Sequence, residues 1–359
     1  MHTFVIVRRV TLPPRPFLRF SVAILLALGI PPVVRAQGTP ARDQAKARID
    51  AALAKREVPS ALAAYDAYVA SGKPDFELLR PIARATLESL ARGAAARSVA
   101  APALERLAGA GDQAALRTLR EFSASETPDT PESAAATLAL ARLGDKQGID
   151  RLGALIDAGS EITRAQLIRA ARDADLRGLI PKLASLLSGS GQGAAAAALA
   201  LGGLQNRDVI PALQTLFDQG QGVVKLAAGV ALTRLGVSIA DQYVTSSLAS
   251  ETPDLRLIAA EAYQGSTRTH WIQYVQDLRT SPNEIARVRA AELLACCRAG
   301  VAQEMLRDAL RSANPTVRAE AARALELRGW SDAARARRLL DDQFEIVRVY
   351  GAGAALRAR

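Results

Sequence analysis

The sequence predicts an all-α solenoid of about eight stacked helical hairpins, each roughly 31 residues long. Three observations support this: a short pattern recurs at a nearly constant interval, each unit holds two apolar stripes with helical spacing, and turn residues separate the stripes. The marker residues that start the units stand 33, 31, 30, 31, 31, 31, 31 and 30 residues apart. They are Ala100, Ser133, Arg164, Ala194, Lys225, Arg256, Arg287, Arg318 and Arg348.

The first helix of each unit carries small residues three and four positions after its marker and a large apolar residue at position seven. Ala290 and Ala291, followed by Leu294, are one example. These positions fall on one helix face, and small side chains let neighbouring helices approach closely. Four units place glycine at position eleven, where a helix needs a left-handed terminating residue. They are Gly111, Gly144, Gly236 and Gly329.

A second apolar ladder of the same period predicts the second helix of each hairpin. Its closing residues are Ile156, Leu187, Phe217, Leu248, Leu278, Leu310 and Leu340. Pro181 and Pro211 each stand at the start of such a helix, where the missing N–H costs nothing. Turns such as Ser281-Pro282-Asn283 separate one unit from the next. Two ladders with one period describe a stack of helical hairpins.

The segment from Val317 to Leu325, like that from Leu255 to Ala262, resembles the first helix of HEAT repeats of the bacterial phycobilisome-lyase-like type. The resemblance covers residues 98–359. It implies that the recurrent marker arginine ties one unit to the next through hydrogen bonds and a nearby acid. Six of the nine markers are basic, whereas Ala100, Ser133 and Ala194 are not, so we expect this ladder to be weakest in the early units.

The two ends of the chain depart from the repeat. Residues 1–36 carry arginines before an apolar run from Phe20 to Ile30 and end in Val34-Arg35-Ala36, which predicts a cleaved signal peptide. That run of about 11 residues is too short for a permanent membrane span, which needs roughly 20. The chain is therefore expected to be exported, to a periplasm or the cell exterior.

Residues 37–97 predict an irregular helical capping region, and residues 98–359 the repeat solenoid. An open stack needs such a cap to cover its first apolar face. At the other end, Tyr350 with Gly351 and Gly353 either seals the stack or lies against a second copy. The oligomeric state is left open.

The charge balance argues against nucleic acid as a partner. The whole chain has a formal charge of +10, but residues 1–36 hold five arginines and no acid, so the mature chain carries +5. That excess lies in residues 287–359, which contain 14 arginines and nine acids. A modest charge on an exported chain does not suit binding to DNA.

Histidine is scarce enough to exclude most catalytic constellations. Outside residues 1–36 the chain contains only His270, whereas nucleophilic triads and zinc sites draw on that side chain. A di-metal enzyme of the deoxyhypusine hydroxylase kind, which has a similar fold, needs repeated His-Glu pairs, and the sequence has none. We therefore expect no enzymatic activity, no catalytic or metal-binding residues and no cofactor.

Two local clusters have competing interpretations. His270 with Tyr263, Trp271 and Tyr274 is either a ligand pocket or, as the ladder positions of the aromatic residues favour, core packing. The adjacent cysteines cannot form a relaxed disulfide with each other. Repeat position predicts a buried Cys297 and a partly exposed Cys296. Three interpretations of the two cysteines stay open: buried filler of the core, a redox pair, or an intermolecular bridge through Cys296.

The predicted function is that of an exported, non-enzymatic scaffold that binds a protein partner through its concave face. An acidic partner would suit the arginines of that face. The HEAT resemblance implies that second helices line this face. Its polar positions run from neutral to basic toward the C-terminus. The alternative is a cofactor- or polyanion-binding protein of the bilin-lyase or nucleic-acid-binding kind. The candidate partner-binding residues are Lys182, Gln242, Gln276, Arg307, Arg335 and Arg338.

Overall fold

The computed structural model describes residues 39–93, 97–124 and 131–358, and the predicted signal peptide lies outside these residues. Within them the chain forms helices and no strand, and no helix is both long and apolar enough to cross a membrane. Short 3-10 turns precede or follow some of the helices. The α-helices are α1 (Thr39–Ala54), α2 (Val58–Val69), α3 (Phe76–Gly93), α4 (Arg97–Gly109), α5 (Gln113–Ser123), α6 (Pro131–Arg142), α7 (Lys146–Ala158), α8 (Glu161–Asp173), α9 (Ile180–Ser185), α10 (Gln192–Gly203), α11 (Ile210–Gln219), α12 (Gly222–Arg234), α13 (Asp241–Ser247), α14 (Pro253–Glu261), α15 (Trp271–Gln276), α16 (Glu284–Leu294), α17 (Ala299–Ala309), α18 (Pro315–Arg328), α19 (Ala333–Leu340) and α20 (Glu345–Arg357).

The predicted all-α solenoid of HEAT-like hairpins is confirmed. Helices α4 to α19 pair into eight successive hairpins, and α20 follows as a single helix. Each marker residue lies in the first helix of its unit. The predicted glycine terminators also take left-handed backbone angles, with φ of 94° at Gly111 and 64° at Gly329. Asp175 and Gln205 occupy the same position in two other units and are left-handed without being glycine.

The marker arginines bind the end of the preceding hairpin. Arg164 Nε donates to the carbonyl of Ile156 at 2.8 Å, and Arg256 Nη2 donates to Ser250 O at the same distance. Arg318 binds Ser312 O at 2.8 Å and reaches forward to Asp342 with two further bonds. Ile156 lies in the last turn of α7, whose carbonyls have no partner within the helix, and Ser250 and Ser312 lie in the turns that follow α13 and α17.

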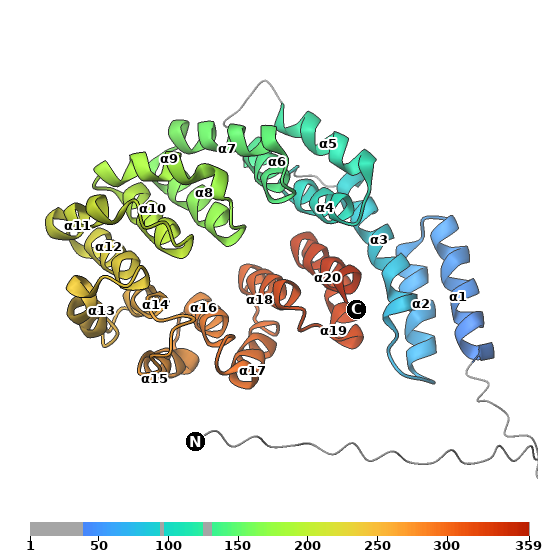
Figure 1. Ribbon diagram of the computed structural model, residues 1–359. Coiled ribbons are helices and arrows are strands. Elements are labelled where there is room, and N and C mark those ends of the chain that lie inside the picture. Colours follow the sequence, from blue (N-terminus) through green and yellow to red (C-terminus); the bar gives the residue numbers. More distant parts are fainter. Residues whose placement is uncertain (1–38, 94–96, 125–130, 359) are drawn as a thin grey trace, which may run out of the picture.

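The stack curves until its two ends meet (Figure 1). Helix α20 packs on α3 and α4, and α19 also contacts α3. Residues from both ends, such as Leu87, Leu104, Ala336 and Ala352, belong to one buried apolar cluster. The solenoid is therefore a closed ring and not an open stack. The C-terminal helix was expected either to seal the stack or to lie against a second copy. The structure shows that it packs on α3 and α4 of its own chain.

First helices form the inner wall of the ring and second helices the outer wall (Figure 1). This corrects the expectation that second helices line the concave side. The physical reason is side-chain size: α10 and α12 are rich in alanine and glycine and pack directly on each other, whereas α11 and α13 carry larger residues and lie farther apart. The helices that approach most closely take the shorter, inner arc.

Candidate functional site

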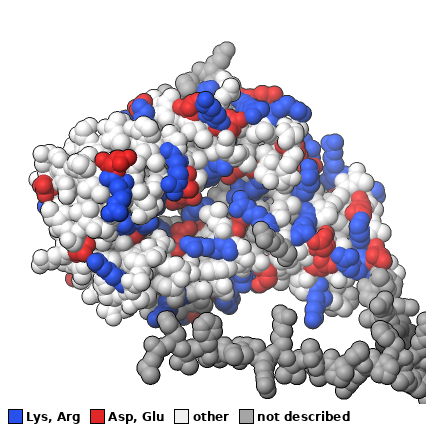
Figure 2. All heavy atoms as spheres, viewed as in Figure 1, with Lys and Arg blue, Asp and Glu red and all other residues white. Residues whose placement is uncertain are grey.

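The middle of the ring holds a cavity of about 860 Å³ whose wall consists of first helices. Helices α8, α10, α12, α14, α16 and α18 all contribute to it. The space-filling view shows the molecule hollowed near its centre, with basic side chains beside the hollow (Figure 2). A volume of this size falls within the range of small-ligand pockets, so the cavity admits a short segment of chain but not a folded domain.

Arg169, Arg172 and Arg234 line the α8, α12 and α14 side of this cavity beside Asp173, Asp175 and Glu261. Glu261 accepts a hydrogen bond from Arg172 Nη1 at 2.8 Å, and its backbone carbonyl accepts one from Arg234 at 2.9 Å. The Nε of Arg234 is buried without a partner, and burial lowers the pKa of that guanidinium.

Arg169 is the least satisfied cation of the cavity. Among the described residues it makes neither a hydrogen bond nor an ion pair. Partial burial inside the ring, and then the positive charges of Arg289 and Arg172, lower the pKa of Arg169. Arg289 comes from α16 and is itself bound to Asp254 at 2.9 Å. An anion bound beside Arg169 would offset the repulsion from Arg289 and Arg172.

The α16 and α18 side is better balanced. Arg323 contacts Glu292 at 2.9 Å and Glu320 at 2.8 Å. Burial raises the pKa of Glu292, although Arg323 opposes this shift. Arg169, which has no partner among the described residues, and the unpaired Nε of Arg234 therefore both lie on the α8 and α12 side of the cavity.

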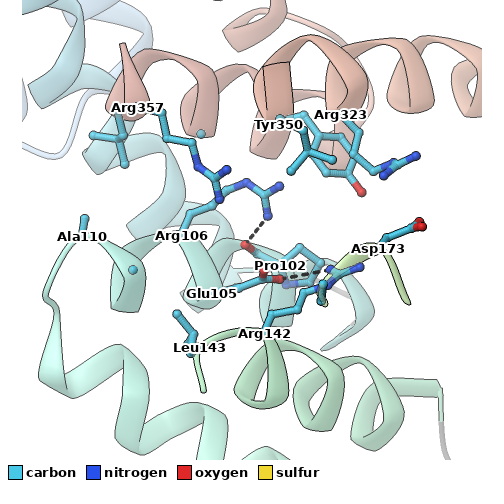
Figure 3. Close-up of a pocket in the computed structure, with 15 residues that line it drawn as sticks. Pro102, Glu105, Arg106, Ala110, Arg142, Leu143, Asp173, Arg323, Tyr350 and Arg357 are labelled. Atoms are coloured by element: carbon cyan, nitrogen blue, oxygen red, sulfur yellow. Dashed lines mark hydrogen bonds and ion pairs between the residues drawn. The ribbon is translucent and has the colours of Figure 1, made fainter. Parts of the chain in front are cut away.

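A second, smaller pocket of about 360 Å³ lies where the ring closes (Figure 3). Its walls come from α4 and α6 on one side and from α18 and α20 on the other. Asp173, Arg323 and Leu327 line both pockets, so the two spaces adjoin. Within the described residues no three histidine, cysteine, aspartate or glutamate side chains are grouped as a metal site would need.

The six residues proposed from the sequence lie on second helices, hence on the outer wall. Lys182 forms an ion pair with Asp157, and Arg335 donates to Trp330 O at 2.7 Å. Arg307 and Arg338 are exposed. None of the six lines either pocket. Whether these residues contact a partner stays a prediction, but they do not belong to the concave face on which that prediction placed them.

Tyr263 and Trp271 of the aromatic cluster pack as core, whereas His270 is exposed. Tyr263 and Trp271 are almost fully buried, the Tyr263 hydroxyl bonds Thr245 at 2.8 Å, and Trp271 Nε1 donates to Arg268 O at 3.0 Å. His270 lies edge-on to Tyr263, with 4.6 Å between ring centroids. This matches the interpretation that the ladder positions favoured.

The cysteines differ from the prediction. Cys296 and Cys297 are both exposed free thiols, whereas a buried Cys297 was expected. Helix α16 ends at Leu294, so the helical repeat position on which that expectation rested does not extend to Cys297.

The residues of the inner wall were missed because helical periodicity does not say which face of a ring turns inward. A signal was present: Arg172, Arg234, Glu261 and Glu292 follow their markers at positions eight, nine, five and five, all on first helices. Polar residues at these positions interrupt an otherwise apolar and small-residue helix, and the structure shows that they line the cavity.

No family model matches the chain, and no curated protein matches its sequence. Among solved structures, human deoxyhypusine hydroxylase in complex with glycerol is similar, with 18% identity and a TM-score of 0.37. The similar part covers 69% of this chain and 97% of that protein. The likeness concerns the fold alone.

The expectation that the chain is not an enzyme is corrected by this comparison. A protein with a similar arrangement of helices bears the name of an enzyme, so the repeat architecture does not exclude catalysis. The likeness also assigns no activity to this chain.

Proposed function

We propose that this chain is an exported, ring-shaped binding protein that holds an acidic segment of a protein partner in its central cavity. The observation that carries the proposal is the group of arginines on α8, α12 and α16, of which Arg169 makes no hydrogen bond or ion pair with the described residues. Carboxylates of a partner would supply the missing acceptors. Arginine suits this task because its planar guanidinium binds carboxylates with two parallel hydrogen bonds.

Two further parts of the proposal rest on the sequence. The marker arginines, which cap the preceding hairpins, support the phycobilisome-lyase-like type of HEAT repeat. The segment 1–36 supports export, to a periplasm or the cell exterior. The size of the cavity favours an extended acidic segment over a folded surface of the partner.

A labelled peptide of alternating aspartate and serine tests the proposal by fluorescence anisotropy. The inner-wall variant Arg169→Gln/Arg289→Gln is expected to bind it at least about tenfold more weakly, since a charge-assisted hydrogen bond contributes about 1.5–3 kcal/mol. The matched control is Arg307→Gln/Arg338→Gln, which removes the same charge from exposed positions on the outer wall. Its affinity should equal that of the unchanged chain.

Three outcomes would contradict the proposal. If only the control variant loses affinity, the partner binds the outer wall. If both lose it equally, the attraction follows net charge and not the cavity. If a single-stranded oligonucleotide binds more tightly than the peptide, with the same inner-wall dependence, the cavity is a polyanion site.

A further inference from the structure

The pocket at the ring seam has a charge imbalance of its own. Glu326 is fully buried and accepts hydrogen bonds from Arg106 Nη2 at 2.6 Å and from Arg106 Nε at 3.0 Å. Arg357, from the last helix, also approaches this carboxylate, but only at 3.4 Å. Two guanidinium groups therefore share one carboxylate. The Arg357 side chain is 53% exposed and keeps donors directed to a further anion.

Arg142 of α6 and Tyr350 of α20 supply a second set of free donors. Arg142 contacts Glu105 only at 3.5 Å, and its side chain is 34% exposed. The Tyr350 hydroxyl makes no hydrogen bond with the described residues and points into the space between the walls (Figure 3). Burial raises the pKa of Tyr350, although Arg106 opposes the shift, so the phenol stays protonated and donates at neutral pH.

The remaining charged groups of the pocket are already paired. Arg323 contacts Glu292 and Glu320, and Asp173 contacts Arg172 at 3.3 Å. Apolar side chains also line the pocket: Leu143, Leu327 and Leu356. The pocket thus combines two sets of anion-binding donors with an apolar lining in about 360 Å³, which is the size of a small-molecule site.

We propose that the seam pocket binds a small dicarboxylate that bridges the two ends of the chain. One carboxylate accepts hydrogen bonds from Arg357 of α20, the other accepts them from Arg142 of α6 and from Tyr350, and the methylene spacer contacts the leucines. Because the walls belong to opposite ends of the solenoid, the ligand stabilises the closed ring. This site adjoins the central cavity but takes its donors from other residues, so it does not depend on the acidic segment proposed above.

A chain-length series of linear dicarboxylates, from malonate to suberate, tests this with the full chain at constant ionic strength. Calorimetric titration and the thermal unfolding midpoint should show saturable binding with an optimum spacer length. Butyrate, which carries one carboxylate, should give neither. Hydrogen exchange should slow in α3 and α20 on binding and stay unchanged in α12.

Variants connect the effect to the pocket. Arg142→Gln and Arg357→Gln should each weaken binding of the best dicarboxylate at least about tenfold, as the loss of a charge-assisted hydrogen bond requires. Tyr350→Phe keeps the ring packing and removes only the hydroxyl, so it should weaken binding while leaving the midpoint without ligand unchanged. Arg338→Gln, on exposed α19 surface, should bind like the unchanged chain.

Two results would overturn the proposal. One is the absence of saturable binding for every member of the series. The other is a binding effect that persists in both Arg142→Gln and Arg357→Gln, because the ligand would then occupy another site.

Discussion

The α10–α12 interface, which joins two consecutive repeats, and the seam between α20 and α3–α4 are built differently. At the α10–α12 interface, the two repeats meet through alanine and glycine, and neither helix contains an acid. At the seam, helices from opposite ends of the chain meet around the buried Arg106–Glu326 pair. Gly353 makes room for it, since a Cβ there would lie 2.3 Å from Glu326 Oε1.

This difference shows two ways to specify a helix contact. Consecutive repeats are held close by the chain itself, so shape and burial are sufficient to set their packing. The seam joins residues 220 positions apart, where the chain does not limit the choice of partner. A buried ion pair with one satisfactory geometry selects a single register there, as polar groups do in coiled coils.

The largest expected effect is at the seam pair. Glu326→Ala leaves the Arg106 guanidinium buried without its carboxylate, which should lower the free energy of unfolding by about 3–5 kcal/mol. Urea unfolding followed by circular dichroism measures this. Glu320→Ala is the control, because its partly exposed pair with Arg323 should contribute less than about 1 kcal/mol.

A double variant sharpens this prediction. Arg106→Met/Glu326→Met replaces both charges with apolar side chains and should recover most of the lost stability. Equal losses from Glu326→Ala and Glu320→Ala would show that the seam pair is no stronger than a surface pair.

Acid should destabilise the seam side of the ring before it destabilises the α10–α12 interface. Arg318 donates to Asp342 at 2.9 and 3.0 Å, and these bonds lower the pKa of that carboxyl although its burial opposes the shift. Asp342→Ala should cost about 1.5–3 kcal/mol at neutral pH. Because the folded pKa is depressed, the stabilisation is present above the ordinary value of 3.8 and is lost as pH falls below it.

The measurement is unfolding of Asp342→Ala and of the unchanged chain from pH 7 down to pH 3. The gap between the two should shrink below pH 3.8. Glu292 has the opposite sign, since burial raises its pKa and protonation relieves its desolvation. A gap that is constant with pH would mean that the Asp342 carboxylate is not stabilised by its charge.

The α10–α12 interface should be sensitive to a change in side-chain volume and not to a change in charge. A Cβ at Gly202 would lie 2.6 Å from Ala231 Cα, so Gly202→Ala forces α10 and α12 apart and should cost about 1–3 kcal/mol. Gly203 is the matched control on the same helix, because its Cβ would meet only Arg172 side-chain atoms at 3.6 Å. Thermal unfolding should show Gly203→Ala to be neutral or slightly stabilising. Equal midpoints for the two variants would contradict this close packing.

The smallest effect is expected at the rim of the seam. Arg337 contacts Asp66 at 2.6 Å, but half of the Asp66 side chain is exposed. Arg337→Gln should therefore lower the free energy of unfolding by only about 0.2–1 kcal/mol, and salt should screen most of that effect. A loss of stability as large as that of Glu326→Ala would show that the exposed rim contact, and not the buried pair alone, stabilises the closed ring.

Repeat periodicity predicted the hairpins and the left-handed positions such as Gly111 and Gly329, and the HEAT resemblance implied the role of Arg256 and Arg318 as ties between units. These features depend on contacts within a unit or with the next one, which a period of about 31 residues records directly. The seal formed by α20 was one of two options, because Gly351 and Gly353 indicate close packing but not the partner.

The candidate partner-binding residues were expected on the concave wall but lie on the outer one, and ring closure was not predicted. Curvature sums small differences in spacing between first and second helices over eight hairpins, and no single residue encodes that sum. The contact between Arg106 and Glu326 exists only once the sum has brought the ends together. The cavity arginines, Arg169 and Arg234 among them, acquire their meaning from the same closure.

Closure also fixes the number of repeats. An open array tolerates the gain or loss of a unit by unequal recombination, since each unit touches only its neighbours. In this ring an extra hairpin would carry α20 past α3, expose the apolar cluster at both ends and separate Arg106 from Glu326. Such a chain would need compensating changes in every interface at once. The gene is thus free to vary its repeats in sequence, but its count of units is held by geometry.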